Sequence, residues 1–332
     1  MRICLCHHLS LSYLGGGEKF IVSLAKELVK RDHNVEIYGM PFLGKNGGLV
    51  NFKDLLEGIP YEEVIRHKVS CDVCYMMYRP LILHNFKSKS PKIAGIHTEL
   101  FWQKKLQLSY GTLASLFYLF NKVYHLADLR QFDAVHSITS AYPINHPHVY
   151  FIHNFVDSQF YVPKNNKEDK FTVTYASRMV WQKGWDKFQQ IAKQLEQYDI
   201  NVKVSSGKVQ ESDMPSFLSS AHVVVVPSRV DTFGILIVEA LMTGTFVITT
   251  SLKTHQFLEL PLIYADSVEE NVAQIIRLKE LWESNKEKYY ELATLGRTSA
   301  LKYDKKVIVD KLEKMFSEVA SNTHQNSEFT EM

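Results

Sequence analysis

Blocks of apolar residues alternate with amphipathic blocks along the first half of the chain. Ile3 to Cys6 is a short apolar run that predicts a strand, and Glu18 to Arg31 has apolar residues three and four apart, which predicts a helix. Further strands are expected at 34–38, 73–77, 93–96, 134–138 and 149–152. Strands that alternate with helices in this way are typical of a mostly parallel sheet with helices on both faces.

The same alternation restarts after a polar stretch, Pro163 to Lys170, which is interpreted as a linker. Val223 to Val226 is apolar throughout, as expected of a central strand in a parallel sheet. We also expect strands at 171–176, 202–205 and 246–249, helices at 185–198, 215–221 and 235–243, and a largely helical remainder to residue 319. The polar tail beyond predicts disorder.

The length of 332 residues favours two domains. We expect two Rossmann-like α/β domains over 1–157 and 158–305, a C-terminal helix over 306–320 that crosses back to the first domain, and a disordered tail over 321–332. Open parallel sheets bind ligands beyond the carboxyl ends of their strands. If those ends face each other, a ligand would lie in a cleft between the domains.

Composition excludes some classes of protein. Hydrophobic residues make up 45% of the chain and the formal net charge is +2, so no strong attraction to nucleic acid is expected. No uncharged apolar run approaches the roughly 18 residues of a spanning helix, and the start predicts a strand rather than a signal peptide, so a cytoplasmic location is the default expectation. Cys71 and Cys74 have the spacing of a zinc or redox pair, but a buried strand there is favoured.

The glycine run Gly15 to Gly17 lies between the first strand and the first helix. Glycines let backbone amides approach a ligand closely, and the start of a helix attracts negative charge. Gly16 and Gly17 are therefore candidates for cradling a phosphate or admitting an acceptor. A flexible turn with no binding role is the alternative.

A basic pair follows the first strand of the second half. Arg178 and Lys183 lie between that strand and the next helix, so both should project from a strand end. A diphosphate is bound by fixed cations of this kind, because arginine grips bidentately and lysine acts as a point charge. Two solvated surface charges are the alternative.

The strongest pattern follows the apolar strand 223–226. Asp231 lies in the loop after that strand, and Glu239 lies eight residues later inside the next helix. The free amides at the start of this helix can bind an anion, which makes Phe233, Gly234 and Ile235 candidates for donor binding. A carboxylate at 239 suits a ribose diol, because it can accept two hydroxyl hydrogens.

Together these segments resemble the retaining nucleotide-sugar glycosyltransferases of the GT-B fold, in particular glycosyltransferase family four, the glycosyl transferases group 1. The resemblance covers nearly the whole chain and includes Asn154 to Asp157 with Phe160, which is similar to the family's interdomain segment. It implies two Rossmann-like domains facing across a cleft, the first holding the acceptor and the second the donor.

The resemblance also implies roles for the residues already singled out. Arg178 and Lys183 would bind the donor diphosphate, Glu239 the ribose, and Asp231 the transferred sugar. His97 follows the strand 93–96, where the family often has a histidine that faces the donor sugar. A structural role is the alternative for this histidine.

Three departures from the family pattern affect the donor sugar more than the fold. Asp231 stands where the family usually has Glu, so its carboxylate is one methylene shorter. Phe155 replaces a glycine, and Thr249 to His255 lacks the glycine-rich loop of many members.

The segment 101–124 is rich in aromatic and aliphatic residues and contains three lysines, at 104, 105 and 122. One interpretation is a basic, aromatic surface that contacts an anionic membrane, at its inner face. Helices that pack on the first sheet are the alternative, and the two stay open.

The expected activity is retaining, metal-independent transfer of a hexose-type sugar from a UDP- or GDP-linked donor to a glycan or lipid-linked acceptor. The resemblance implies a hexosyltransferase of the EC 2.4 class with no metal and no cofactor, the nucleotide-sugar being a co-substrate. His97, Arg178, Lys183 and Asp231 are the expected catalytic residues. The alternative is a catalytically weakened, nucleotide-binding partner of another glycosyltransferase, for which the Asp231 change argues.

Overall fold

The computed structural model describes residues 1–8, 10–11, 16–39, 55–64, 67–78, 86–88, 90–97, 128–164 and 166–328. The chain divides into two units, one of Met1–His153 with Val309–Met332 and the other of Asn154–Ile308. The boundary expected at 157/158 lies a few residues later than this division.

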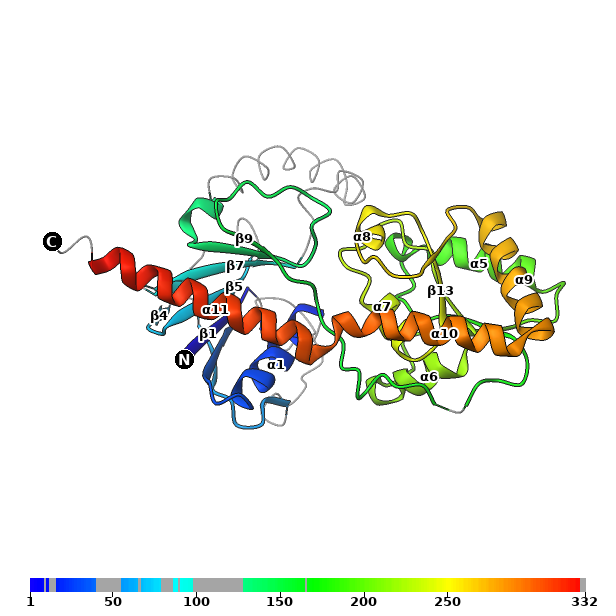
Figure 1. Ribbon diagram of the computed structural model, residues 1–332, viewed down its shortest axis with the longest axis horizontal. Helices are drawn as coiled ribbons and strands as arrows, with labels where there is room; N and C mark the ends of the chain where they lie inside the picture. Colours follow the sequence, from blue (N-terminus) through cyan, green and yellow to red (C-terminus); the bar gives the residue numbers. More distant parts are fainter. Residues whose placement is uncertain are drawn as a thin grey trace. The chain divides into compact units, whose positions relative to one another are not determined.

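The first unit contains a seven-stranded parallel sheet of order β3-β2-β1-β5-β7-β8-β9. Its strands are β1 Arg2–His7, β2 Asn34–Gly39, β3 Tyr61–Glu63, β5 Val73–Met77, β7 Lys92–Ile96, β8 Ala134–Ser137 and β9 Val149–Phe151. The short strands β4 His67–Val69 and β6 Phe86–Ser88 form a separate pair. Helix α1, Gly16–Val29, and helix α11, Lys305–Glu328, belong with this sheet, and Figure 1 shows α11 running across it beside α1.

The central strands of this sheet are apolar on both faces, as a parallel strand covered by helices must be. In β1, Ile3 and Leu5 are fully buried, and Cys4 lies opposite Cys74 of β5 in the register. All four cysteines are free thiols, and the interpretation of residues 73–77 as a buried strand is confirmed.

The second unit contains a five-stranded parallel sheet of order β11-β10-β12-β13-β14. Its strands are β10 Thr172–Tyr175, β11 Asn201–Val204, β12 Val223–Val226, β13 Phe246–Thr249 and β14 Ile263–Tyr264. The helices are α5 Trp185–Leu195, α6 Met214–Ser220, α7 Ile235–Met242, α8 Lys253–Gln256, α9 Val268–Ser284 and α10 Lys286–Ala300. Helix α5 packs with α9, while α7 packs with α6 and α10 (Figure 1). Two parallel α/β units confirm the predicted fold class.

The polar stretch 163–170, interpreted as a linker, lies within the second unit. The Lys167 ammonium donates to the carbonyl of Ala221 and to the hydroxyl of Thr245 at 3.0 Å. The Asn166 amide donates to the backbone and side chain of Ser216. Backbone carbonyls at the end of α6 therefore hold this stretch against the second unit.

Helix α11 continues to Glu328, into the segment 321–332 for which the composition predicted disorder. Residues 329–332 lie outside the described residues.

The two places where the chain passes between the units are tied together. Val156 forms a parallel bridge with Asp304, and its amide donates to the carbonyl of Tyr303 at 3.0 Å. Asp157 forms an ion pair of 2.6 Å with Lys305 at the start of α11. The segment that resembles the family's interdomain motif is thus bonded to the returning chain.

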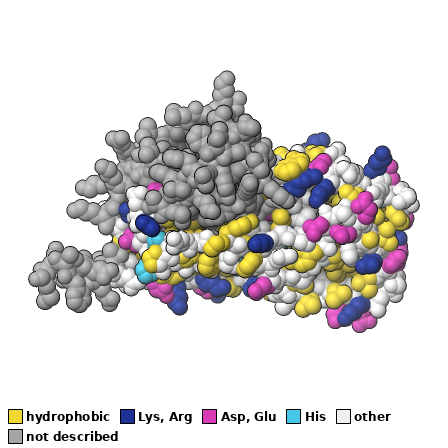
Figure 2. All heavy atoms as spheres, turned by 90° about the horizontal axis from the view of Figure 1, so that it is seen from above, with side chains coloured by type: hydrophobic (Ala, Val, Ile, Leu, Met, Phe, Trp, Pro, Cys, Tyr) yellow, Lys and Arg dark blue, Asp and Glu magenta, His cyan; other side chains and the backbone are white. Residues whose placement is uncertain are grey.

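Charged side chains of both signs are mixed among apolar ones over the second unit, as Figure 2 shows for one face. This agrees with the formal net charge of +2. No helix in the described part of the chain is long and apolar enough to cross a membrane. The segment 101–124, for which membrane contact was an open interpretation, lies outside the described residues.

Two buried histidines should make the fold sensitive to acid. Burial lowers the pKa of His136 to about 4 and that of His222 to about 3. The unfolded chain binds protons on these rings below its ordinary pKa of about 6.5, whereas the folded chain does not. The free energy of unfolding should therefore fall as pH drops from about 6.5 towards 4, His136 alone contributing up to about 1.4 kcal/mol per pH unit.

Denaturant unfolding at pH 7 and pH 5 checks this expectation. The variant His222→Asn keeps an acceptor for the Thr172 amide, which now donates to His222 Nδ1 at 3.0 Å, and should flatten the pH dependence. The exposed His148→Gln is the control and should leave the slope unchanged. An equal slope in all three proteins would contradict the assignment to buried rings.

Candidate active site

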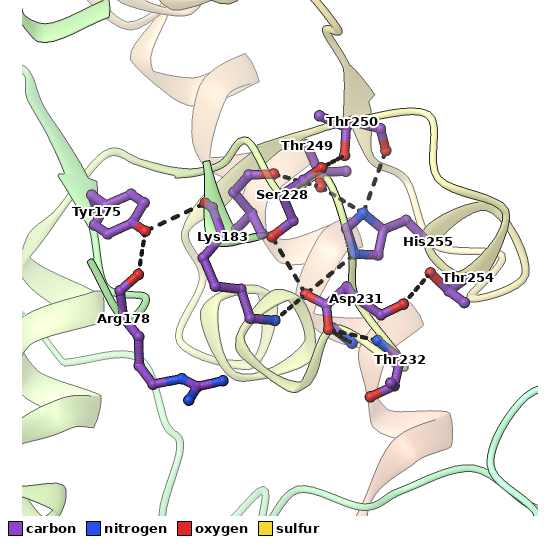
Figure 3. Close-up of polar contacts among 12 residues, drawn as sticks. Tyr175, Arg178, Lys183, Ser228, Asp231, Thr232, Thr249, Thr250, Thr254 and His255 are labelled. Carbon is purple, nitrogen blue, oxygen red and sulfur yellow. Dashed lines mark hydrogen bonds and ion pairs between the residues drawn. The ribbon is translucent and has the colours of Figure 1, made fainter. Parts of the chain in front are cut away.

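The loop that follows β10 carries both predicted cations and is anchored by a buried tyrosine. The Tyr175 hydroxyl donates to the carbonyl of Arg178 at 2.7 Å and lies 3.3 Å from the carbonyl of Lys183 (Figure 3). Tyr175 is fully buried, and burial raises the pKa of its phenol. One core side chain thus fixes both ends of the loop at the carboxyl edge of the sheet.

The end of this loop is also fixed by close contact between Gly184 and the backbone of Pro227. Gly184 has φ +71° and ends the 3₁₀ turn Trp181–Lys183. A Cβ at Gly184 would lie 2.0 Å from the carbonyl oxygen of Pro227, just beyond β12. Only glycine fits both the left-handed backbone and this contact, so the loops after β10 and β12 are held together.

Lys183 and Asp231 meet where these two loops come together. The Lys183 Nζ lies 2.8 Å from Asp231 Oδ2, and the carboxylate is buried while the ammonium is partly exposed. Figure 3 shows the Lys183 and Arg178 side chains leaving their loop on its lower side in that view. Arg178 itself is exposed. The structure thus brings the predicted cation Lys183 and the predicted carboxylate Asp231 into one ion pair.

Hydrogen bonds surround the Asp231 carboxylate on its other sides. Its Oδ1 accepts the amides of Thr232 at 2.9 Å and Gly234 at 3.2 Å. The Ser228 hydroxyl donates to Oδ2 at 3.5 Å. Burial alone raises the pKa of Asp231, but the Lys183 charge and the contact with His255 outweigh it and hold that pKa well below its usual range. Asp231 is therefore ionised and fixed in place.

His255 is a residue of this site that the sequence did not single out. Its Nε2 lies 3.5 Å from Asp231 Oδ2, and the ring is fully buried. Its Nδ1 lies 2.8 Å from the hydroxyl of Thr249, whose own proton is donated to the carbonyl of Val226. Nδ1 therefore carries the proton that Thr249 accepts. The neighbouring Thr254 hydroxyl donates to the Asp231 carbonyl at 3.0 Å. The segment 249–255, which lacks the family's glycine-rich loop, therefore binds the backbone of Asp231 directly.

Arg229 was also missed by sequence reasoning. Its guanidinium forms two bonds of 2.6 Å with Asp186 at the start of α5. It also donates to the carbonyl of Trp181 and stacks over that ring, 4.8 Å from its centroid. Arg229 thus clamps the 3₁₀ turn that presents Lys183. No periodicity marks this arginine, because its partners come from a distant segment of the chain.

The start of α7 is arranged differently from the expectation. Gly234 has φ +82° and its amide is already donated to Asp231, so it is not an open donor for an anion. Phe233 is buried and packs edge-on against Tyr303, with ring centroids 5.6 Å apart. Ile235, the first residue of the helix, is exposed. Of the three predicted binding positions, only Ile235 presents an exposed residue.

Glu239 lies on α7 and is half-buried. Its carboxylate forms a hydrogen bond with the phenol of Tyr161, and burial together with this carboxylate raises the Tyr161 pKa. The Asp231 contact with the Gly234 amide connects the Lys183 ion pair to the helix that carries Glu239. Sequence reasoning did not identify Tyr161, although it lies directly after the interdomain motif.

The predicted residues of the first unit lie around the start of α1 and the end of β7. A Cβ placed on Gly16 would meet no atom of the described residues within 4 Å, whereas one on Gly17 would lie 2.8 Å from the Met77 side chain and 3.2 Å from that of His7. A side chain at 17 would therefore require the end of the Met77 side chain to shift, whereas position 16 is open. Gly15 lies outside the described residues.

His97 follows β7 and is half-buried. Its Nε2 lies 2.7 Å from the Tyr75 hydroxyl, and its ring lies 4.3 Å from that of Phe20 on α1. The histidine is therefore held by both the sheet and the helix that follows the glycine turn. Within the described ranges, no group of three or more His, Cys, Asp and Glu side chains is arranged to hold a metal ion.

Comparison with known proteins finds a family match over part of the second unit. Residues 184–257, which include Gly184, Asp231 and His255, match the model of the glycosyl transferases group 1. None of the curated proteins matches the chain.

Several solved structures share the fold at low sequence identity. Sucrose-phosphate synthase from Thermosynechococcus elongatus superposes with a TM-score of 0.72 at 14% identity, covering 97% of this chain and 100% of its own. A glycosyltransferase from Rickettsia africae gives 0.71 at 12% identity, with 97% and 99% covered. Anabaena HepE in complex with UDP and glucose gives 0.68 at 14% identity, with 95% and 99% covered.

These likenesses show the GT-B fold, and the match over 184–257 begins directly after Lys183 and includes its partner Asp231. The chain therefore has the GT-B fold, and residues 184–257 of its second unit match the glycosyl transferases group 1.

Proposed function

We propose that the protein transfers a hexose-type sugar from a UDP- or GDP-linked donor to a glycan or lipid-linked acceptor, with retention at the anomeric carbon and without a metal. The observation that carries the proposal is the Lys183–Asp231 ion pair of 2.8 Å beside the exposed Arg178, at the carboxyl edge of the second sheet. This is where an open parallel sheet binds its ligands.

The basic pair is suited to a diphosphate. Lys183 has three N–H donors, and one of them suffices for Asp231, which leaves donors for phosphate oxygens. Arg178 can bind two oxygens in parallel through its planar guanidinium. As the bond from the sugar to the diphosphate breaks, negative charge grows on the leaving group, and these two cations stabilise it. The proposal assigns to them the role that a metal ion has in other transferases.

Asp231 is proposed as a positioning group rather than a nucleophile. One oxygen forms the ion pair with Lys183, and the other accepts the amides of Thr232 and Gly234. A carboxylate held by these contacts orients the lysine, and its remaining lone pairs can accept a hydrogen bond from the sugar. The shorter side chain of Asp231, relative to the family's usual Glu, fits this retracted position.

Glu239 is proposed to bind the ribose of the nucleotide. The Tyr161 phenol donates to this carboxylate, and the remaining lone pairs can accept hydroxyl hydrogens from a diol. His97 of the first unit is proposed to contact a hydroxyl of the transferred sugar. Anabaena HepE in complex with UDP-glucose, a protein of similar fold, supports a UDP-linked hexose as the first donor to test.

A donor panel measured by thermal and chemical unfolding tests the proposal. A UDP- or GDP-sugar at 100 times its dissociation constant should raise the free energy of unfolding by about 2.7 kcal/mol. Arg178→Ala should lower the affinity for that donor by at least about tenfold, because a charge-assisted bidentate contact is lost. Arg277→Ala, which removes an exposed arginine on α9, is the matched control and should bind normally.

Release of UDP or GDP during incubation then separates an enzyme from a binding protein. Donor binding with no turnover in the presence of glycan and lipid-linked acceptors would favour the catalytically weakened alternative. Equal affinity in Arg178→Ala and the control would remove Arg178 from the donor site.

A further inference from the structure

A chain of hydrogen bonds crosses the first sheet beneath His97. The Tyr75 hydroxyl on β5 lies 2.7 Å from His97 Nε2 and 2.7 Å from His136 Nδ1 on β8. His136 Nε2 lies 2.7 Å from the carbonyl oxygen of Ile152, just after β9. Four neighbouring strands therefore contribute to one chain of polar groups, which we call the His97 relay: His97, Tyr75, His136 and the carbonyl of Ile152.

The sheet makes room for this relay at one glycine. Gly95 of β7 lies opposite His136 in the register, two residues before His97. A Cβ on Gly95 would lie 2.1 Å from the Tyr75 hydroxyl oxygen and 2.3 Å from the carbon that bears it. The tyrosine can reach across β7 to His136 only because position 95 has no side chain.

The direction of every proton in the relay follows from its buried end. A carbonyl oxygen only accepts, so the Nε2 of His136 must carry a hydrogen. His136 is fully buried, and burial lowers its pKa to about 4, so near neutral pH its Nδ1 bears a lone pair. That lone pair accepts the Tyr75 proton.

The single Tyr75 proton then decides the state of His97. Burial raises the pKa of Tyr75 well above its usual value, so the phenol keeps its one hydrogen. Since that hydrogen is donated to His136, the oxygen offers His97 only a lone pair. The His97 Nε2 must therefore be the donor of the 2.7 Å contact.

We propose that Tyr75 and His136 are positioning residues that hold neutral His97 as its Nε2–H tautomer and keep Nδ1 as the accepting nitrogen of the ring. Contact between the Phe20 and His97 rings restricts the ring further, at 4.3 Å between centroids. The inference deepens the proposed function: an Nδ1 lone pair accepts a hydrogen bond from a sugar hydroxyl and fixes the sugar for transfer. A second-layer partner of this kind selects the tautomer and orientation of a histidine.

Side-chain nitrogen NMR of histidine-labelled protein tests the tautomer without reference to activity. Comparison with His97→Asn assigns the signals of His97. Near neutral pH the wild type should show a protonated Nε2 and an unprotonated Nδ1. Tyr75→Phe removes the fixed acceptor, and signals of both tautomers should appear. His136→Leu leaves the Tyr75 proton without its acceptor, which lets it turn to His97 and should shift His97 towards the Nδ1–H form.

Tyr150→Phe is the matched control, because it removes a hydroxyl from the same sheet outside the relay, where it donates to Glu318. The His97 signals should be unchanged in this variant. An Nδ1–H tautomer in the wild type, or identical His97 signals in wild type and Tyr75→Phe, would overturn the proposal.

Turnover provides the second readout. Tyr75→Phe should lower the rate of nucleotide release from the donor sugar about tenfold, as expected for one lost hydrogen bond to an oriented group. Its affinity for UDP alone should stay that of the wild type, because the proposed nucleotide site is in the second unit. If Tyr75→Phe lost affinity for UDP as well as turnover, the substitution would be acting on the structure in general and not on His97. If the wild type turns over no donor, the proposed function fails while the NMR experiment still decides the tautomer.

Discussion

Replacing Lys183 with alanine is expected to lower sugar transfer by about 10²- to 10³-fold, the usual cost of removing one preorganised charge from a transition state. Lys183 is the cation that Asp231 and the turn ending at Gly184 hold in place. Its ammonium would meet the negative charge that grows on the leaving diphosphate. Initial rates of nucleotide release, measured with the donor identified by the unfolding panel, check this expectation.

The same substitution leaves Asp231 buried without its main counter-charge, so it should also destabilise the fold, by about 3 kcal/mol or more. The double variant Lys183→Ala with Asp231→Asn removes the unpaired charge. It should recover much of the stability but none of the transfer. Lys193→Ala, an exposed lysine on α5, is the control for charge alone. Transfer near the wild-type rate in the double variant would rule out the role given to Lys183.

Gly184→Ala is expected to destabilise the second unit by about 3 kcal/mol and to weaken donor binding together with stability. About 1–2 kcal/mol follows from a left-handed backbone at φ +71°. The remainder follows from the methyl group, which would lie 2.0 Å from the Pro227 carbonyl oxygen and must push the loops apart. Chemical denaturation and donor titration of the same preparations measure both effects.

Gly207→Ala separates the two contributions. Gly207 has φ +68°, and a Cβ there would have open space in the described structure. The Gly207→Ala substitution should therefore cost only the contribution of the left-handed backbone, about 1–2 kcal/mol, and leave donor binding intact. Similar losses at 184 and 207 would mean that close approach to Pro227 contributes little.

The sequence predicted the fold best where strands are central. Val73–Met77 and Val223–Val226 were predicted with their observed bounds, because continuous burial on both faces demands an unbroken apolar run. The edge strands Tyr61–Glu63 and Ile263–Tyr264 were missed. They are too short for a periodic pattern, and β3 consists largely of charged residues, so pairing with the neighbouring strand defines it.

The candidate site could be predicted where it depends on local position. Lys183 and Asp231, which the fold brings into one ion pair, were singled out together with Arg178 because each follows a strand end. His255 and Arg229 were not, because their roles arise from contacts with segments that only the folded chain brings near. Tyr75 and His136 lie 61 residues apart and each has the pattern of an ordinary strand residue. A chain of hydrogen bonds between different strands produces no periodic pattern in the sequence, so it could not be predicted.

The buried hydroxyl of Tyr175 has a thermodynamic consequence for the loop that it anchors. Ordering a short turn costs conformational entropy of about 1–2 kcal/mol for each residue. Since a core side chain already bonds to both ends of this turn, that cost is incurred when the chain folds and not when a ligand arrives. Donor affinity should then reflect charge and contact alone, and loosening the anchor would weaken binding without touching any atom of the ligand.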